Sequence, residues 1–270
     1  MSNILYVSDL DGTLLRDDET LSEYTISVIN SLVSRGLKFS IATARSKITA
    51  NKVIKGLLVN FPMIVYNGTM IVDSLSNRVL ISNYFTYNDS VNIHDILSSF
   101  KISPIVYSMI NGVEKFSYID SRVNDYMAEY LKSRNGDVRE RSVKDDSSLY
   151  AGETFYYTCI DTAERLIQAY AVLKDNYNCI LQEDYYTKNA WLEVLPKGVN
   201  KANAILQLKD YLHCDEVVCF GDGLNDMDMF KVCDRSYAVN NAIQSLKEVA
   251  TDTIGDNLND GVANWLLKNT

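Results

Sequence analysis

The chain has 270 residues, of which 47% are hydrophobic and 23% are charged, and its formal net charge at pH 7 is −9. This length and composition predict a globular protein with a sizeable core and room for two domains. The acidic balance, without a block of Lys or Arg, argues against nucleic acid and membranes as partners, whereas a small anionic substrate needs only local positive charge.

No basic segment and no long apolar stretch precedes Asp9, so we expect neither a signal peptide nor a transmembrane helix. The five cysteines form no Cys-x-x-Cys pair, which predicts free thiols in a reducing compartment and hence a cytoplasmic protein. Only two histidines are present, which argues against a zinc site. We expect a monomer or a small homo-oligomer.

Strands and helices alternate in the first third of the chain. Three apolar runs predict buried strands: 4–7, 37–42 and 63–66. Apolar residues at helical spacing predict one helix from the capping box 20–23 to Gly36 and another beginning at Ser46. Strands that alternate with helices predict a parallel sheet with right-handed crossovers. Asn67-Gly68 predicts a turn after the third strand.

Residues 84–192 differ in character, being rich in tyrosine and predicted to contain both strands and helices. We expect a hairpin formed by 102–110 and 113–119, and helices at 123–131 and 163–173. Two further strands are expected at 154–160 and 179–186. The polar stretch 134–148 is expected to be a mobile loop.

After Pro196 the first pattern returns. We expect a helix at 200–212, a buried strand at 216–220 and a short helix from Met227. A strand at 237–239 and an apolar helix at 262–267 follow. We therefore predict an α/β fold whose core is a Rossmann-like, doubly wound parallel sheet of residues 1–83 and 193–270. An α+β cap domain of residues 84–192 is inserted into it.

Two carboxylates, Asp9 and Asp11, directly follow the first strand. Asp and Gly are ordinary turn residues, so a surface turn is the simplest interpretation. A central strand of an open α/β sheet, however, ends at the edge where ligands bind. Two neighbouring acids repel each other unless a cation or a shared proton relieves the repulsion.

Three further groups of polar residues end a predicted strand or begin the helix after one: Thr43, Lys201, and Asp222 with Asn225 and Asp226. Oxygen ligands without histidine or thiolate suit Mg²⁺, whose charge allows the carboxylates to stay ionised. A carboxylate such as Asp9 can attack phosphorus, and Asp11 can act as general acid and base. Lys201, Thr43 and the backbone N–H groups around Leu10 can neutralise the phosphoryl oxygens.

These segments resemble the four motifs of the haloacid dehalogenase superfamily, in their order and in their separations: 9–15, Thr43 with Arg45, Lys201, and 221–226. The insert between the second and third motifs, and the tail 259–262, are similar to those of the Cof-type (class IIB) sugar-phosphatase branch.

The resemblance implies a Mg²⁺-dependent phosphatase that hydrolyses small phosphorylated metabolites, such as sugar phosphates, through an aspartyl-phosphate on Asp9. It implies that Asp9 is the nucleophile and Asp11 the general acid and base. The implied metal site consists of Asp9, Asp11 through its backbone carbonyl, Asp222 and, in direct or supporting contact, Asp226. The implied substrate- and phosphate-binding residues are Leu10, Thr43, Ala44, Arg45, Lys201 and Asn225. Ala44 departs from the family, which usually has glycine there.

Several alternatives stay open at this stage. Lys201 also fits an ordinary first-turn helix lysine, and Thr43 a helix cap. Arg45 fits either a substrate contact or an ion pair with a carboxylate. The segment 221–226 nearly matches a dinucleotide-binding fingerprint but lacks its third glycine. A phosphomutase with the same intermediate, or a phosphometabolite-binding regulatory protein without turnover, remains the alternative function.

Overall fold

The computed structural model describes residues 3–76, 78–183 and 189–270. The chain divides into two compact units, of which unit 1 runs up to Ser82 and again from Val199 to Thr270, and unit 2 from Asn83 to Gly198. The first division lies next to the expected one, whereas the second lies between 198 and 199 instead of 192 and 193. It lies later because strand β11 (Ala190–Leu195) pairs with two strands of unit 2.

Unit 1 is built on the predicted parallel sheet, which is confirmed. Its five strands have the order β14-β13-β12-β1-β2 and all pair in parallel. Their bounds are β1 (Ile4–Ser8), β2 (Lys38–Ile41), β12 (Glu216–Gly221), β13 (Arg235–Val239) and β14 (Asp252–Ile254). Ser8 pairs with Ile41 and with Phe220, so the segments that follow β1, β2 and β12 leave the sheet at the same edge.

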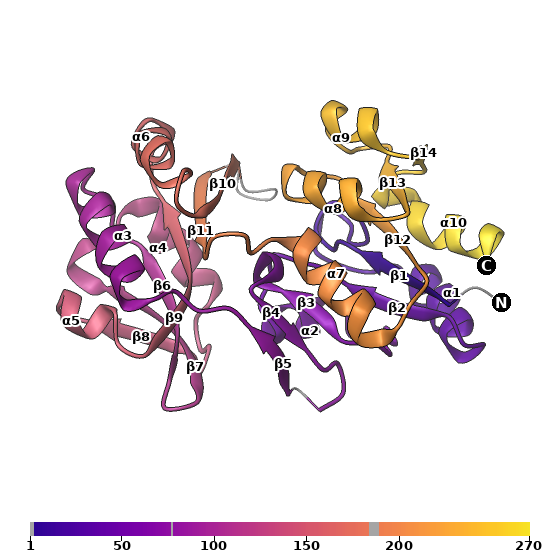
Figure 1. Ribbon diagram of the computed structural model, residues 1–270, viewed down its shortest axis with the longest axis horizontal. Coiled ribbons are helices and arrows are strands. Elements are labelled where there is room, and N and C mark those ends of the chain that lie inside the picture. Colours follow the sequence, from indigo (N-terminus) through magenta and orange to yellow (C-terminus); the bar gives the residue numbers. More distant parts are fainter. Residues whose placement is uncertain (1–2, 77, 184–188) are drawn as a thin grey trace. The chain divides into compact units, whose positions relative to one another are not determined.

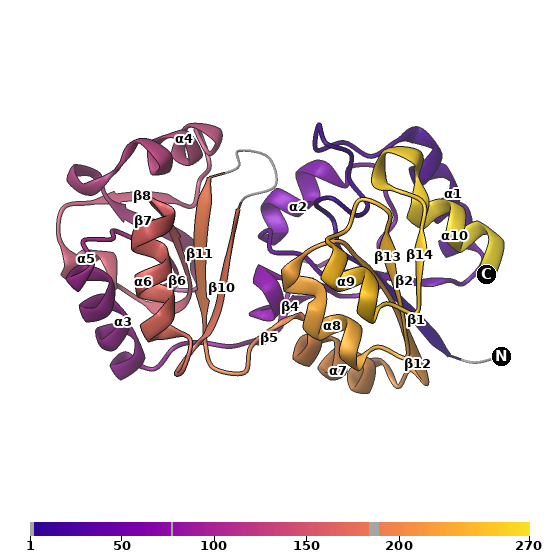
Figure 2. The ribbon, with the colours of Figure 1, turned by 90° about the horizontal axis from the view of Figure 1, so that it is seen from above.

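Helices flank this sheet, with α1 against α10 and with α7, α8 and α9 in contact in that order. Figure 2 shows these two groups on opposite sides of the strands. The helices of unit 1 are α1 (Glu23–Ser34), α2 (Lys47–Val53), α7 (Lys201–Leu212), α8 (Met227–Val232), α9 (Gln244–Val249) and α10 (Gly261–Asn269). Short 3₁₀ turns also belong to unit 1: η1 (Tyr66–Gly68), η3 (Leu224–Asp226) between β12 and α8, and η4 (Asn257–Asn259) between β14 and α10.

The start of α1 differs from the expected capping box. Ser22, and not Thr20, is the N-cap, and its Oγ accepts the N–H of Thr25 at 2.8 Å. The Thr20 hydroxyl instead donates to Asp18 Oδ1 at 2.5 Å. The local turn at 18–20 therefore takes the side chain that the sequence pattern assigned to the helix.

A small antiparallel sheet completes unit 1, in the order β3-β4-β5: β3 (Met63–Val65), β4 (Met70–Val72) and β5 (Val79–Ser82). A single parallel bridge, between Ala42 and Ile64, links β3 to the segment directly after β2. The turn η1, at the predicted Asn67-Gly68 turn, connects β3 to β4.

Unit 2 contains a six-stranded sheet of order β10-β11-β9-β6-β7-β8, antiparallel except for the parallel pair β7 and β8 (Figure 1). Besides β11, its strands are β6 (Ile105–Ile110), β7 (Val113–Ile119), β8 (Glu140–Val143), β9 (Glu153–Ile160) and β10 (Asn178–Glu183). Its helices are α3 (Tyr87–Ser99), η2 (Asp120–Arg122), α4 (Asp125–Ser133), α5 (Asp146–Leu149) and α6 (Ala163–Leu173). The predicted strand 179–186 is β10 up to Glu183, and residues 184–186 lie outside the described residues.

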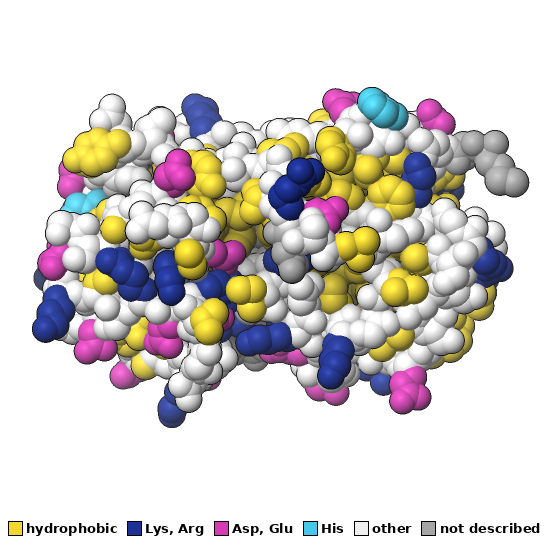
Figure 3. Space-filling model, turned by 90° about the horizontal axis from the view of Figure 1, so that it is seen from below, with side chains coloured by type: hydrophobic (Ala, Val, Ile, Leu, Met, Phe, Trp, Pro, Cys, Tyr) yellow, Lys and Arg dark blue, Asp and Glu magenta, His cyan; other side chains and the backbone are white. Residues whose placement is uncertain are grey.

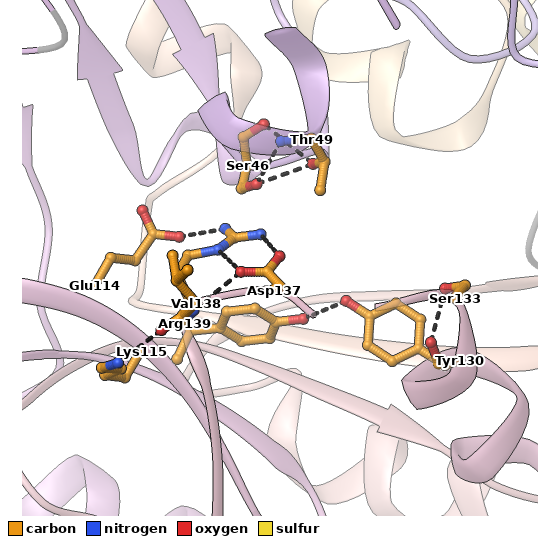
Figure 4. Close-up of polar contacts among 10 residues, drawn as sticks. Ser46, Thr49, Glu114, Lys115, Tyr130, Ser133, Asp137, Val138 and Arg139 are labelled. Carbon is orange, nitrogen blue, oxygen red and sulfur yellow. Dashed lines mark hydrogen bonds and ion pairs between the residues drawn. The ribbon is translucent and has the colours of Figure 1, made fainter. Parts of the chain in front are cut away.

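The expectation of a mobile loop at 134–148 is wrong, because this stretch contains β8 and most of α5. Arg139 is buried there, and its guanidinium bonds to the carboxylates of Asp137 and Glu114 (Figure 4). It also lies 5.8 Å from the centre of the Phe116 ring. Charged residues that neutralise one another can be buried, so the polar composition did not reveal an ordered segment.

Charged side chains are distributed over the surface. Figure 3 shows Lys and Arg interspersed with Asp and Glu on the face it draws. None of the helices formed by the described residues has the length and apolar character needed to cross a membrane.

Candidate functional site

The centre of the candidate site is the ammonium group of Lys201, the first residue of α7. Asn200 caps this helix, because its side chain accepts the N–H of Asn203 at 2.8 Å. The Lys201 side chain is 1% exposed, and its Nζ donates to Asp9 Oδ1 at 2.6 Å and to Asp226 Oδ1 at 2.8 Å. A lysine on the surface of a helix does not have two buried carboxylate partners, so the ordinary helix-lysine interpretation is excluded.

The segment after β12 is folded around the carboxylate of Asp226. Its Oδ2 accepts the backbone N–H groups of Asp222 and Gly223, both at 3.0 Å. A Cβ atom at Gly221 would lie 2.7 Å from the Asp226 carboxylate carbon, so glycine is required there for this close approach. Thr13 donates its hydroxyl to Asp222 Oδ1 at 2.8 Å and thereby orients the second carboxylate.

Carboxylate oxygens of Asp9, Asp222 and Asp226 all lie within 4.8 Å of one another. Burial raises the pKa of Asp9 to about 7, although Lys201 opposes the shift. Burial, followed by the charges of Asp9 and Asp226, also raises the pKa of Asp222. Burial alone would lower the pKa of the Lys201 ammonium, but its two carboxylate partners outweigh burial and raise it.

This donor set fits a hard divalent cation. The three residues offer oxygen ligands only, without histidine or thiolate, as Mg²⁺ prefers. Burial raises the pKa values of Asp9 and Asp222, and the charges of the neighbouring carboxylates, which one ammonium cannot balance, add to this effect. A bound cation would supply the missing positive charge.

The raised pKa of Asp9 predicts how stability depends on pH in the absence of metal. The unfolded carboxyl ionises near pH 4, whereas the folded one does so at about 7, so the folded state binds this proton more tightly. We therefore expect the free energy of unfolding, measured with urea in EDTA, to fall as the pH rises from about 4 to about 7. Asp9→Asn should reduce this fall, and Mg²⁺ should oppose it in the parent. An identical pH dependence of the free energy of unfolding in parent and variant would contradict a raised pKa of Asp9.

Thr43 follows β2 at the same edge of the sheet and is fully buried. Its Oγ1 accepts the N–H of Arg45 at 3.0 Å, while Ser46, not Thr43, caps α2 by accepting the N–H of Thr49 at 3.1 Å (Figure 4). The helix-cap alternative for Thr43 is therefore excluded. Ala44, which stands where the family usually has glycine, lies between Thr43 and Arg45 and is partly exposed.

The guanidinium of Arg45 pairs with carboxylates. Its Nε lies 2.9 Å from Asp11 Oδ2 and its second terminal nitrogen 2.5 Å from Asp11 Oδ1. The same nitrogen lies 2.9 Å from Glu19 Oε2. Of the two alternatives left open by the sequence, the carboxylate pair is the one present here, and a substrate contact of Arg45 stays a prediction.

The structure thus brings together residues from all four predicted segments within unit 1. Leu10 is buried, and its carbonyl accepts the N–H groups of Thr13, Leu14 and Leu15, which folds the chain back after Asp9. Asn225 donates its side-chain amide to Asn67 Oδ1 at 3.1 Å.

Three residues that contact the site were not among the predicted ones: Thr13, Glu19 and Asn67. Thr13 lies inside the first motif, and Asn67 in an Asn-Gly pair after a predicted strand, so both had a local signal. Glu19 had none, because it approaches Arg45 only after the turn at 16–19 has formed.

Comparisons with known proteins agree with this geometry. The sequence profile of a family described as haloacid dehalogenase-like hydrolase matches residues 6–266. The chain is 26% identical over 275 residues to 5-amino-6-(5-phospho-D-ribitylamino)uracil phosphatase YitU of Bacillus subtilis (strain 168), an alignment that covers 97% of this chain and 96% of that protein.

Solved structures show the same fold. The crystal structure of TM0651 from Thermotoga maritima is similar with a TM-score of 0.81 and 26% identity, covering 100% of this chain and 98% of that one. A haloacid dehalogenase-like hydrolase from Bacteroides thetaiotaomicron has a TM-score of 0.81 at 20% identity, covering 99% of both chains, and this likeness concerns the fold alone.

Proposed function

The chain belongs to the haloacid dehalogenase-like hydrolase family and is a phosphatase, and we propose that it hydrolyses sugar phosphates and similar small phosphorylated metabolites with Mg²⁺. The observation that carries this proposal is the buried Lys201 ammonium between Asp9 and Asp226, with Asp222 beside them. These groups offer a nucleophile, a place for a cation and a positive charge for a phosphoryl group.

In the first half of the proposed reaction, a carboxylate oxygen of Asp9 attacks phosphorus and the ester P–O bond breaks. Asp11 gives its proton to the departing alkoxide, so that the product leaves as a neutral alcohol. Lys201 holds Asp9 in place through the 2.6 Å hydrogen bond and keeps its charge near the attacked group.

In the second half, water attacks the phosphorus of the aspartyl-phosphate. Asp11, now ionised, accepts the proton of that water, and the bond between the Asp9 oxygen and phosphorus breaks to release inorganic phosphate. Both residues return to their starting protonation states, so the cycle is balanced.

Charge neutralisation supplies the rest of the rate enhancement, because hydrolysis of phosphate monoesters is among the slowest uncatalysed reactions. Thr43, Lys201 and the N–H groups near Leu10, Ala44 and Asn225 would bind the phosphoryl oxygens. Asp9, Asp222 and the carbonyl of Asp11, with Asp226 in support, would hold Mg²⁺, which supplies further positive charge at those oxygens.

We assign substrate selection to unit 2, because the residues named above all belong to unit 1. The name of the Bacillus subtilis relative describes a phosphorylated ribityl compound, which is in keeping with a phosphorylated sugar or sugar alcohol as substrate here.

Phosphate release from a panel of sugar phosphates, nucleotides and the phosphoribityl compound, with Mg²⁺ or with EDTA, tests the proposal. We expect release with Mg²⁺ from one or more sugar phosphates and none in EDTA. Release that is equal in EDTA would overturn the metal requirement. With a hexose 1-phosphate, conversion to another phosphate isomer instead of free phosphate would indicate a phosphomutase.

The contact of Arg45 with Asp11 predicts how variants of this pair behave. Arg45→Lys loses the two-pronged hydrogen bond that orients Asp11, so we expect kcat to fall by about 10-fold with a smaller change in KM. Glu19 is half-exposed, and Glu19→Gln should lower kcat by at most about 5-fold. Steady-state kinetics on the best substrate measure both effects. A rise in KM at constant kcat would show that Arg45 binds substrate instead.

A further inference from the structure

The turn η1 has a backbone conformation that its sequence does not favour. Tyr66, Asn67 and Gly68 have φ values of 52°, 51° and 100°, three left-handed residues in succession, and only the last is glycine. All three are buried. Left-handed backbone is unfavourable for a bulky residue such as Tyr66, so the surroundings must hold the turn in this form.

The turn contacts three of the four motif segments, namely Thr43 with Arg45, the start of the Lys201 helix, and 221–226. The first two contacts involve its backbone. The N–H groups of Tyr66 and Asn67 donate to the carbonyls of Arg45 and Thr43, both at 3.0 Å. A Cβ atom at Gly68 would lie 2.2 Å from the carbonyl oxygen of Asn200, so this glycine packs directly against the N-cap of the helix that begins with Lys201.

The third contact is made by a side chain. Asn67 is 1% exposed, and its Oδ1 accepts the side-chain N–H of Asn225 at 3.1 Å. Asn225 lies in η3, directly before Asp226, whose carboxylate bonds to Lys201. The Asn67 amide therefore links the loop of Thr43 to the loop that carries Asp222 and Asp226.

We propose that Asn67 is a positioning residue, which fixes the loop of the metal-binding carboxylates at its working distance from the loop that binds the phosphoryl group. This inference rests on the proposed function. Asn67 acts through Asn225 and the backbone of Thr43. The loop of Thr43 and the loop of Asp222 and Asp226 must both contact the same phosphoryl group or the cation bound to it. Second-sphere hydrogen bonds of this kind set the orientation of the groups that touch metal and substrate.

The presence of asparagine at position 67 has a second explanation, which involves the backbone only: asparagine tolerates left-handed backbone in turns. The chain provides a matched control for it in the hairpin turn Asn111-Gly112 of unit 2. Asn111 has the same φ of 51° and is also followed by a glycine, but it is exposed. The two asparagines thus share a left-handed φ and a following glycine, and they differ in burial and in the bond to Asn225.

Asn67→Gly and Asn111→Gly separate the two explanations, because glycine keeps the left-handed backbone without strain and removes only the side chain. We expect Asn67→Gly to lower kcat by about 10- to 100-fold and to weaken the Mg²⁺-dependent binding of inorganic phosphate, measured by calorimetry. Asn111→Gly should leave both at the parent value. Parent-like kcat and phosphate affinity in a folded Asn67→Gly would overturn the proposal.

Asn225→Ala removes the other end of the same hydrogen bond and keeps the test valid if Asn67→Gly does not fold. The losses of Asn67→Gly and Asn225→Ala should be strongly non-additive in the double variant. Additive losses would overturn the proposal. Absence of turnover in the parent would instead refute the proposed function, while the phosphate-binding comparison would still decide the role of Asn67.

Discussion

Replacing Asp9 with asparagine is expected to reduce phosphate release by about 10⁴-fold or more, because an amide cannot attack phosphorus as a carboxylate does. The substitution nearly preserves shape, and Lys201 keeps its second partner, Asp226, at 2.8 Å. The loss should therefore appear in kcat, with the fold intact. Phosphate release and circular dichroism, measured on the same preparation, check both parts.

The control for this experiment is Asp18→Asn, which changes an exposed aspartate in the same N-terminal region. Its turnover should equal that of the parent. Turnover of phosphate esters by Asp9→Asn at the parent rate would remove the nucleophile assignment and with it the aspartyl-phosphate mechanism. A folded Asp9→Asn that still binds inorganic phosphate but does not turn over would support it.

The second large effect is expected from Lys201→Met. Methionine is close to lysine in length but leaves Asp9 and Asp226 buried without their shared ammonium. Breaking a buried ion pair by removing one partner costs about 3–5 kcal/mol of the free energy of unfolding. We expect urea denaturation in EDTA to show a loss of this size, and Mg²⁺ to restore part of it by binding the same carboxylates.

A second lysine on the same helix provides the matched control. Lys209 pairs with Asp234 at 2.9 Å, and their side chains are 24% and 41% exposed, against 1% for Lys201. Such surface pairs contribute at most about 1 kcal/mol, so Lys209→Met should hardly change the urea midpoint. Equal losses for Lys201→Met and Lys209→Met would show that the buried network does not stabilise the fold.

Much of unit 1 was predictable because its sequence signals are local. Apolar runs of strand length, helices between them and acidic residues at strand ends predicted the parallel sheet and the edge where the polar residues meet. Parallel strands that start and end in register bring Asp9, Thr43 and Asp222 to one edge whatever the details of the loops. The order of the motifs then predicted the family, which the comparison confirmed.

Contacts between segments distant in the sequence were decided by the tertiary structure alone. The polar stretch 134–148 is ordered because the Arg139 guanidinium pairs with the carboxylates of Asp137 and of Glu114, which lies on β7. In the same way, nothing near Arg45 in the sequence indicates that Glu19 will share its charge.

The sequence by itself determined which chemical groups the site contains and the sheet edge at which they lie, because both follow from local patterns and from the geometry of parallel strands. The tertiary structure decided which of these groups are paired and how deeply they are buried. Pairing and burial depend on side chains from distant segments, and they set the pKa of Asp9, the partners of Lys201 and the link between Asn67 and Asn225.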